Sequence, residues 1–265
     1  MPATVNKQQQ LNTAYAALKK KFPLPAAARD EPRPVLEELI YAVCREGTTT
    51  ADADRAYDAL RKTFVDWNEV RVSTVQEVGD SLRPLPGAGL KAGWIIALLQ
   101  AVFEMTYSYD LDELEKKGLK QAAKQLARYF DPKDLEKLGL RQAAKQAARL
   151  ETMHDFAVAW VVQRRLGGHA MPLDGPTLRV LRRLAVVDPG EPESLESLRG
   201  SVEHVVPKAR GPELTDLLSV HAKELCTDAA PDCAHCPLKA DCPAGQQFLA
   251  AAKKPAADAK PKKSR

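Results

Sequence analysis

Residues 226–242 read CTDAAPDCAHCPLKADC, a C-x6-C-x2-C-x5-C spacing of four cysteines: Cys226, Cys233, Cys236 and Cys242. Two prolines, Pro231 and Pro237, interrupt the stretch, and it has no regular hydrophobic period. Such a segment is too polar to fold around a core of its own. A metal centre can fold it, because ligand bonds supply folding free energy. We therefore expect the four thiolates to share one metal centre.

Three kinds of bond could hold these thiols. Disulfides need an oxidising compartment, and the first ten residues, MPATVNKQQQ, contain no apolar signal core. Structural zinc usually takes two CxxC pairs, and only Cys233 and Cys236 have that spacing. A four-iron four-sulfur cluster tolerates uneven spacing, because each cysteine binds a different corner of a cube. The spacing resembles the loop that closes the endonuclease III family of DNA glycosylases, and this resemblance implies a 4Fe-4S cofactor.

Length and composition set bounds on the fold. A chain of 265 residues, 45% of them hydrophobic, can bury a sizeable core and could form one large domain or two small lobes. It contains no run of eighteen apolar residues, so we expect neither a transmembrane helix nor a membrane partner. The net charge of +4 and the pI near 8.7 permit a nucleic-acid partner without requiring one.

From Pro34 onward, apolar residues recur at the three-and-four spacing of amphipathic helices. PVLEELIYAVCREG, ADADRAYDALRKTF and VSTVQEVGDSL share this period, Cys44 lies in the first of them as an expected core residue, and no alternating strand pattern occurs. The sequence therefore predicts an all-α fold. We expect an N-terminal arm over residues 1–30, a helical domain over 31–245, and a disordered basic tail over 246–265, which lacks an apolar period.

Residues 111–150 contain an internal duplication. GLKQAAKQLAR at 118–128 recurs as GLRQAAKQAAR at 139–149, with nine of eleven positions identical at a period of 21. The FDPKD segment between them supplies a proline and an aspartate cap, so we expect two similar helices joined by a turn. Two copies are too few for a solenoid. We expect a helical insertion whose basic side chains are either solvated or in contact with DNA phosphates: Lys120, Lys124, Arg141 and Lys145.

A second resemblance lies upstream of the cysteines. GGHAMPLDGPTLRVL, residues 167–181, is similar to the Gly-containing turn, aspartate and helix of the endonuclease III family, with Asp174 at the aspartate's place and 52 residues before Cys226. The resemblance covers about residues 34–245. It implies a two-lobed helix-hairpin-helix DNA glycosylase fold, in which the aspartate stabilises positive charge on the sugar as a flipped-out base leaves. Asp174 is also a typical helix N-cap, and the two roles are compatible.

Three positions depart from the family's pattern. Bifunctional members carry a nucleophilic lysine about eighteen residues before the aspartate, where this chain has Phe156, which we expect to form a pocket wall. The hairpin glycines are replaced by residues 150–154, LETMH, which predicts weaker phosphate binding there. Glu46, in CREGTTT, stands where the family has a glutamine that supports the flipped-out nucleotide, so we expect Glu46 in the pocket.

Lys91 has two possible roles. LPGAGLK, residues 85–91, has the letters of a helix-hairpin-helix signature, and in that register Lys91 would be the nucleophile. However, 83 residues separate Lys91 from Asp174, and GAGLKAGWII resembles better an earlier helix start of the family. We therefore expect Lys91 to begin a helix, solvated or touching the DNA backbone. Arg179 and Lys239 are further candidates for phosphate contacts.

These features support three hypotheses of function. The first is a DNA glycosylase of base excision repair that removes a damaged or mispaired base by hydrolysis, using Asp174 and a water molecule. The second is a catalytically inactive iron-sulfur homologue that binds DNA. The third is a bifunctional glycosylase and AP lyase that uses Lys91. In each case we expect a monomer, cytoplasmic and associated with the nucleoid, whose partner is double-stranded, damaged DNA.

Overall fold

The computed structural model describes residues 6–24, 32–140, 152–187 and 194–253. Within these ranges every regular element is a helix and no strand occurs, so the predicted all-α class is confirmed. Local sequence sets several helix starts. The Thr49, Asp66 and Thr74 side chains each accept the backbone N–H three residues later, as N-caps do. Thr74 and Glu77 form a complete capping box.

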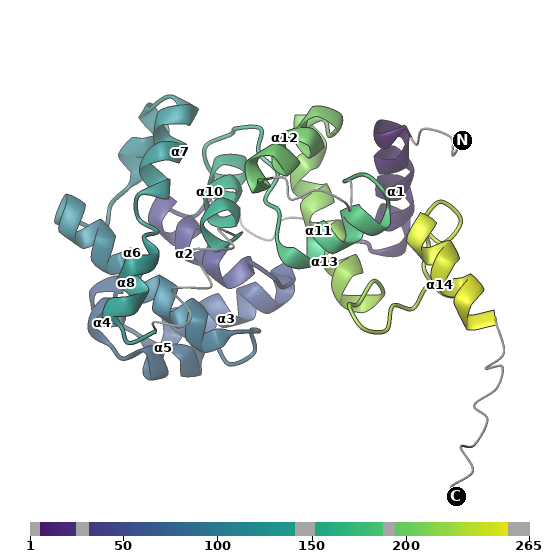
Figure 1. The fold of residues 1–265 in the computed structure, drawn as a ribbon. Helices are drawn as coiled ribbons and strands as arrows, with labels where there is room; N and C mark the ends of the chain where they lie inside the picture. The colour runs from purple at the N-terminus through teal and green to yellow at the C-terminus, as the bar shows by residue number, and fades with distance from the viewer. Residues whose placement is uncertain (1–5, 25–31, 141–151, 188–193, 254–265) are drawn as a thin grey trace, which may run out of the picture.

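Two hydrophobic cores divide the described residues into two lobes (Figure 1). The first core draws its side chains from residues 35–161. Its elements are α2 (Val35–Arg45), α3 (Thr50–Thr63), α4 (Trp67–Val72), α5 (Val75–Ser81), α6 (Ala88–Thr106), η1 (Asp112–Lys116), α7 (Leu119–Ala127), α8 (Pro132–Lys137) and α10 (Thr152–Arg164).

The second core combines residues 11–22 with residues 171–242. Its elements are α1 (Lys7–Lys21), α11 (Gly175–Arg183), α12 (Leu195–Val205), η2 (Lys208–Arg210), α13 (Gly211–Glu224) and α14 (Pro243–Lys253). The predicted N-terminal arm therefore contains a helix of this lobe, because α1 packs against α12 and α13 (Figure 1). The prediction of a disordered tail from residue 246 is wrong for residues 246–253, which continue α14.

The most apolar helix, α6, lies inside the first lobe. Its length and mean hydropathy would suffice to cross a membrane, but 56% of that window is buried inside the protein. Burial against α2, α4 and α5 accounts for its composition without a membrane.

The duplicated segment is described only in part. The first copy forms α7, whose Lys120 and Lys124 are exposed on the surface. The linking FDPKD segment starts α8, with Asp131 as its N-cap. Most of the second copy, with Arg141 and Lys145, lies outside the described residues, as do Leu150 and Glu151 of the LETMH stretch.

Buried charges join the two lobes. Arg45, the last residue of α2, is 0% exposed and donates to Asp216 Oδ1 at 3.3 Å and to Ser219 Oγ at 2.7 Å, both on α13. Arg164 of α10 binds the other Asp216 oxygen at 2.9 Å. Further ion pairs link Lys223 to Asp52 and Arg199 to Asp155. These contacts fix the end of α2 against α13, beside the start of α11.

Candidate active site and cysteine pocket

Asp174 lies at the junction of the two lobes. It is 1% exposed and is the N-cap of α11, as the sequence predicts, with Oδ1 accepting the Thr177 N–H at 2.8 Å. Its second oxygen, Oδ2, accepts the backbone N–H of Gly47 at 2.9 Å, and Gly47 belongs to the first lobe. Two backbone donors from different lobes therefore hold one carboxylate.

An open pocket of about 230 Å³ adjoins Asp174. Both lobes contribute to its walls, and its lining mixes acidic, basic and hydroxyl side chains. The lining residues are Gly47, Thr48, Asp174, Pro176, Arg179, Ser219, Ala222, Lys223, Thr227 and Asp228. None of these side chains is aromatic. The pocket can therefore offer hydrogen bonds and charge to a ligand, but no ring for stacking.

Glu46 and Lys91 lie together next to this junction. The Lys91 ammonium donates to Val43 O and Glu46 O, each at 2.6 Å, and to Glu46 Oε2 at 3.4 Å. Burial lowers the pKa of Lys91, while the Glu46 carboxylate opposes that change. Burial raises the pKa of Glu46. The Lys91 ammonium opposes this increase, and the nearby charge of Asp174 adds to the increase. Neither residue lines the pocket itself.

The expected surface position of Lys91 is wrong. Lys91 is 3% exposed, and its ammonium is directed to protein acceptors instead of solvent or phosphate. The cause is the last turn of α2 and the turn that follows it, which present the Val43 and Glu46 carbonyl groups to the start of α6. Sequence spacing could not show this, because the two segments are 45 residues apart.

The expected pocket wall at Phe156 is also wrong. Phe156 is 1% exposed in the core of the first lobe, and its ring stacks on Trp160 with centroids 5.8 Å apart. It does not line the pocket beside Asp174. Burial of the large apolar surface of a phenylalanine ring is favourable, and the interior of the first lobe buries this ring almost completely.

The two predicted phosphate-binding cations lie in different surroundings. Arg179 lines the pocket, and its guanidinium donates to Cys226 O at 3.0 Å and to Ala222 O at 3.1 Å, so it also holds the end of α13. Lys239 is exposed in the cysteine loop and donates to Ala234 O at 3.1 Å. DNA contact by either remains a prediction.

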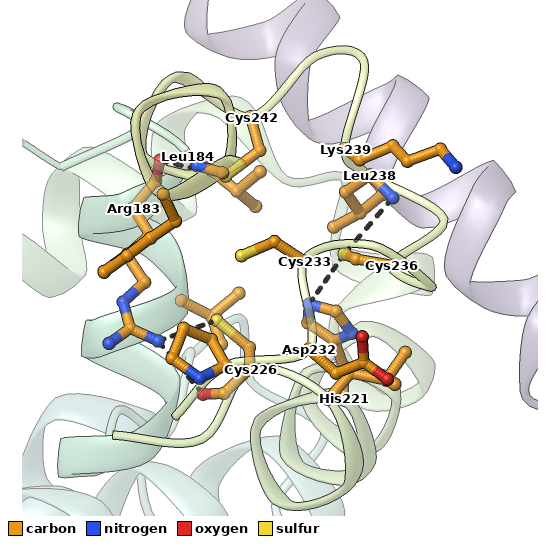
Figure 2. Close-up of a pocket in the computed structure, with 15 residues that line it drawn as sticks. Arg183, Leu184, His221, Cys226, Asp232, Cys233, Cys236, Leu238, Lys239 and Cys242 are labelled. Carbon is orange, nitrogen blue, oxygen red and sulfur yellow. Dashed lines mark hydrogen bonds between the residues drawn. The ribbon is translucent and has the colours of Figure 1, made fainter. Parts of the chain in front are cut away.

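All four predicted cysteine ligands line one pocket, next to α11 and α13 (Figure 2). The pocket is narrow, with a volume of about 20 Å³, and Val180, Leu184, Leu225 and Leu238 supply apolar walls. Among the residues described, no three His, Cys, Asp or Glu side chains converge on a point where a single metal ion would sit. The fifth cysteine, Cys44, is 0% exposed in the first core, as predicted.

N–H groups approach three of the four sulfurs. Arg183 Nη1 lies 3.3 Å from Cys226 Sγ, Leu238 N lies 3.4 Å from Cys236 Sγ, and Gly245 N lies 3.3 Å from Cys242 Sγ. Such donors stabilise thiolate charge. A side chain at position 245 would contact Cys242, so a glycine there keeps this N–H close to the sulfur.

The protein alone does not favour four thiolates here. Burial raises the pKa of Cys236 to about 11 and also raises the pKa values of Cys233 and Cys242, and charge on neighbouring thiolates would raise all three further. A bound metal removes this cost, because metal coordination deprotonates a thiol. The donor set therefore fits a thiolate-bound metal centre.

Sequence reasoning missed two contributors to the Asp174 site. Gly47 acts through its backbone N–H. A glycine directly after a predicted helix could have indicated a turn at this position. Lys223 lines the pocket and pairs with Asp52 of α3. No local pattern distinguishes Lys223 from the other lysines of the chain, because only the approach of the two lobes brings it there.

No protein-family model matches this sequence, and no curated protein matches it. Solved structures do match its fold. A trapped endonuclease III-DNA covalent intermediate aligns over 91% of this chain and 98% of its own, with 19% identity and a TM-score of 0.57. A non-covalent endonuclease III-DNA complex aligns over 92% and 98%, with 19% identity and a TM-score of 0.58. A thermostable thymine-DNA glycosylase aligns over 92% and 99%, with 15% identity and a TM-score of 0.55. The chain therefore has the endonuclease III-like DNA glycosylase fold that the sequence predicts.

Proposed function

We propose that this protein is a DNA glycosylase of base excision repair that removes a damaged or mispaired base by hydrolysis. The observation that carries the proposal is the position of Asp174. Its carboxylate is buried, held by two backbone N–H groups, and adjoins a polar pocket between the lobes of a fold that solved DNA glycosylases share. A nucleotide rotated out of duplex DNA needs a recess of this kind.

The proposed chemistry follows from the charges at the pocket. As the N-glycosidic bond breaks, positive charge develops on the sugar, and a fixed carboxylate beside it lowers the energy of that state. Asp174 supplies this carboxylate, and its hydrogen bonds keep it oriented before the substrate arrives. Arg179 and Lys223 place cations on the same pocket, where they suit phosphates that flank the extruded nucleotide.

An AP-lyase step needs a lysine that can reach C1′ of the sugar. Phe156 cannot serve, and the Lys91 ammonium is enclosed by three acceptors. Lys223 lines the pocket but is ion-paired with Asp52. We expect borohydride to trap no covalent complex with abasic DNA. A trapped adduct would establish lyase chemistry, and the lysine that carries the reduced sugar, Lys91 or Lys223, would be identified by mass spectrometry of the trapped peptide.

The cysteine pocket is proposed to hold a 4Fe-4S cluster through Cys226, Cys233, Cys236 and Cys242. The supporting observations are four thiols around one space, three N–H groups directed at their sulfurs, and apolar walls. When bound, such a cluster folds its loop and holds α14 on the second lobe. Iron and acid-labile sulfide analysis of anaerobically purified protein tests this assignment, and one zinc per chain would refute it.

Base excision is tested on a panel of duplexes that carry oxidised, alkylated or mismatched bases. We expect at least one substrate to be cleaved, and Asp174→Asn to lower its single-turnover rate by about 10²- to 10³-fold with DNA affinity retained. Asp66→Asn is the matched control, since Asp66 is also a helix N-cap but lies outside the pocket. Wild-type protein that binds every duplex but excises nothing would instead support the inactive DNA-binding homologue.

A further inference from the structure

We propose that Lys91 is a positioning residue for Asp174, because it occupies the carbonyl groups at the end of α2 and thereby releases the Gly47 N–H to bind the carboxylate. The inference rests on the proposed function, in which Asp174 is the catalytic group. It gives Lys91 a part in the reaction although Lys91 neither lines the pocket nor reaches the surface.

The hydrogen bonds at the end of α2 show how the release works. In a continuing α-helix the Gly47 N–H would donate to Val43 O, four residues earlier. Here the Lys91 ammonium donates to Val43 O at 2.6 Å, and the Gly47 N–H donates to Asp174 Oδ2 at 2.9 Å. The previous residue still follows the helical pattern, since Glu46 N donates to Ala42 O. The exchange of partners therefore occurs at Gly47.

A tight turn holds the Gly47 N–H in this direction. Glu46 has φ −56° and ψ 130°, Gly47 has φ +73°, and Thr48 N donates to Arg45 O at 3.2 Å. These values describe a type II β-turn, whose third position favours glycine. Lys91 ties this turn to α6 through its bond to Glu46 O, and Arg45 ties it through Thr48 O. Lys91 and Arg45 thus fix the turn from both sides.

The N–H donors of Lys91 hold this arrangement. Its ammonium donates to two carbonyl groups and to the Glu46 carboxylate, while the surrounding burial disfavours a cation. A methionine of similar length would fill the space but would leave Val43 O and Glu46 O without this donor. Without Lys91 the turn loses its tie to α6, so we expect the Gly47 N–H to turn away from Asp174 and become exposed to solvent, and Asp174 to keep only its Thr177 donor.

The test compares Lys91→Met and Gly47→Ala with a matched control, Gly139→Ala. Gly47 and Gly139 both have positive φ, +73° and +79°, and an added Cβ would meet nothing within 4 Å at either position. Both alanines therefore strain the backbone without a clash, but Gly139 follows α8, away from Asp174. Gly47→Ala changes the turn with Lys91 in place, so a wild-type excision rate in Gly47→Ala would refute the role of this turn even if Lys91→Met does not fold.

Two measurements decide the outcome. Single-turnover excision should slow at least about 10-fold in Lys91→Met and in Gly47→Ala, with the DNA dissociation constant unchanged, and Gly139→Ala should excise at the wild-type rate. In addition, hydrogen exchange of the Gly47 amide should accelerate in Lys91→Met and in Asp174→Ala, but not in Gly139→Ala. A wild-type excision rate in Lys91→Met, or a change confined to DNA affinity, would overturn the proposal.

The amide measurement separates this inference from the proposed function. If wild-type protein excises no base, the glycosylase proposal fails, while the Gly47 amide still reports whether Lys91 directs it to Asp174. Unchanged Gly47 exchange in a folded Lys91→Met variant would refute the positioning role, whatever the wild-type activity.

Discussion

Replacement of Arg45 by methionine should destabilise the whole protein, because Arg45 is the most enclosed charge between the lobes. Its guanidinium is 0% exposed and donates to Thr48 O, to Thr50 Oγ1 at 3.3 Å, to Asp216 Oδ1 at 3.3 Å and to Ser219 Oγ at 2.7 Å. Methionine is shorter and unbranched, and it offers no donor. The substitution thus keeps the apolar stem of the side chain and removes the guanidinium group with its hydrogen bonds.

The expected loss of unfolding free energy depends on which partners Asp216 keeps when Arg45 is replaced. Removal of one partner of a buried ion pair costs about 3–5 kcal/mol. Asp216 keeps its bond to Arg164 at 2.9 Å and is 17% exposed, so its charge is not left isolated. We therefore expect the lower end, about 3 kcal/mol, against a total stability of about 5–15 kcal/mol for a protein of this kind.

Urea unfolding followed by circular dichroism and by tryptophan fluorescence measures this loss. Arg83→Met is the control, because Arg83 is 75% exposed in its pair with Asp80 and should cost less than about 1 kcal/mol. If Arg45→Met costs no more than Arg83→Met, the buried network does not hold the lobes together. We expect a double-mutant cycle of Arg45→Met with Asp216→Asn to show a coupling energy of more than about 1 kcal/mol. A coupling energy of zero would also contradict a role for the network.

Three further predictions concern single sites. Burial raises the pKa of Glu46, so the folded protein binds a proton at this carboxylate more tightly than the unfolded chain does. The unfolding free energy of the wild type relative to Glu46→Gln should therefore rise as the pH falls from neutral through the raised pKa toward the ordinary value of 4.5. A constant difference in urea unfolding free energy across that range would contradict this prediction. Cys236→Ala should lose iron and accelerate hydrogen exchange in α14 while first-lobe amides stay protected, and Cys44→Ala should keep its iron; equal iron content in both variants would exclude Cys236 as a ligand. Phe156→Ala should cost about 3–5 kcal/mol in unfolding free energy, as a core truncation does, and a cost below about 1 kcal/mol would place Phe156 outside the core.

Sequence reasoning succeeded where spacing along the chain determines position. The four cysteines lie within seventeen residues, so their loop could only bring them to one place. Asp174 precedes Gly-Pro-Thr, a local signal for a helix start, and the structure has it as the N-cap of α11. The helical class followed from the hydrophobic period alone.

Sequence reasoning failed where the neighbours of a side chain come from distant segments. Lys91 looked like a surface lysine because lysine is rarely buried, yet a turn 45 residues earlier supplies its acceptors. Phe156 was assigned to the pocket by counting back from Asp174, but the rotation of α10 directs it into the core. In both cases the direction of the side chain in the packed lobe determined its neighbours, and sequence spacing does not give that direction.

The pairing of α1 with the C-terminal helices has a consequence for biosynthesis. The first lobe draws its core from one continuous stretch, residues 35–161, and can close while the ribosome is still at work. In contrast, α1 is made before the first lobe and must wait for α12 and α13, since its side chains bind partners such as Glu213 and Arg210 that are made almost two hundred residues later. Until then its apolar face, with Leu11 and Leu18, needs shielding from aggregation.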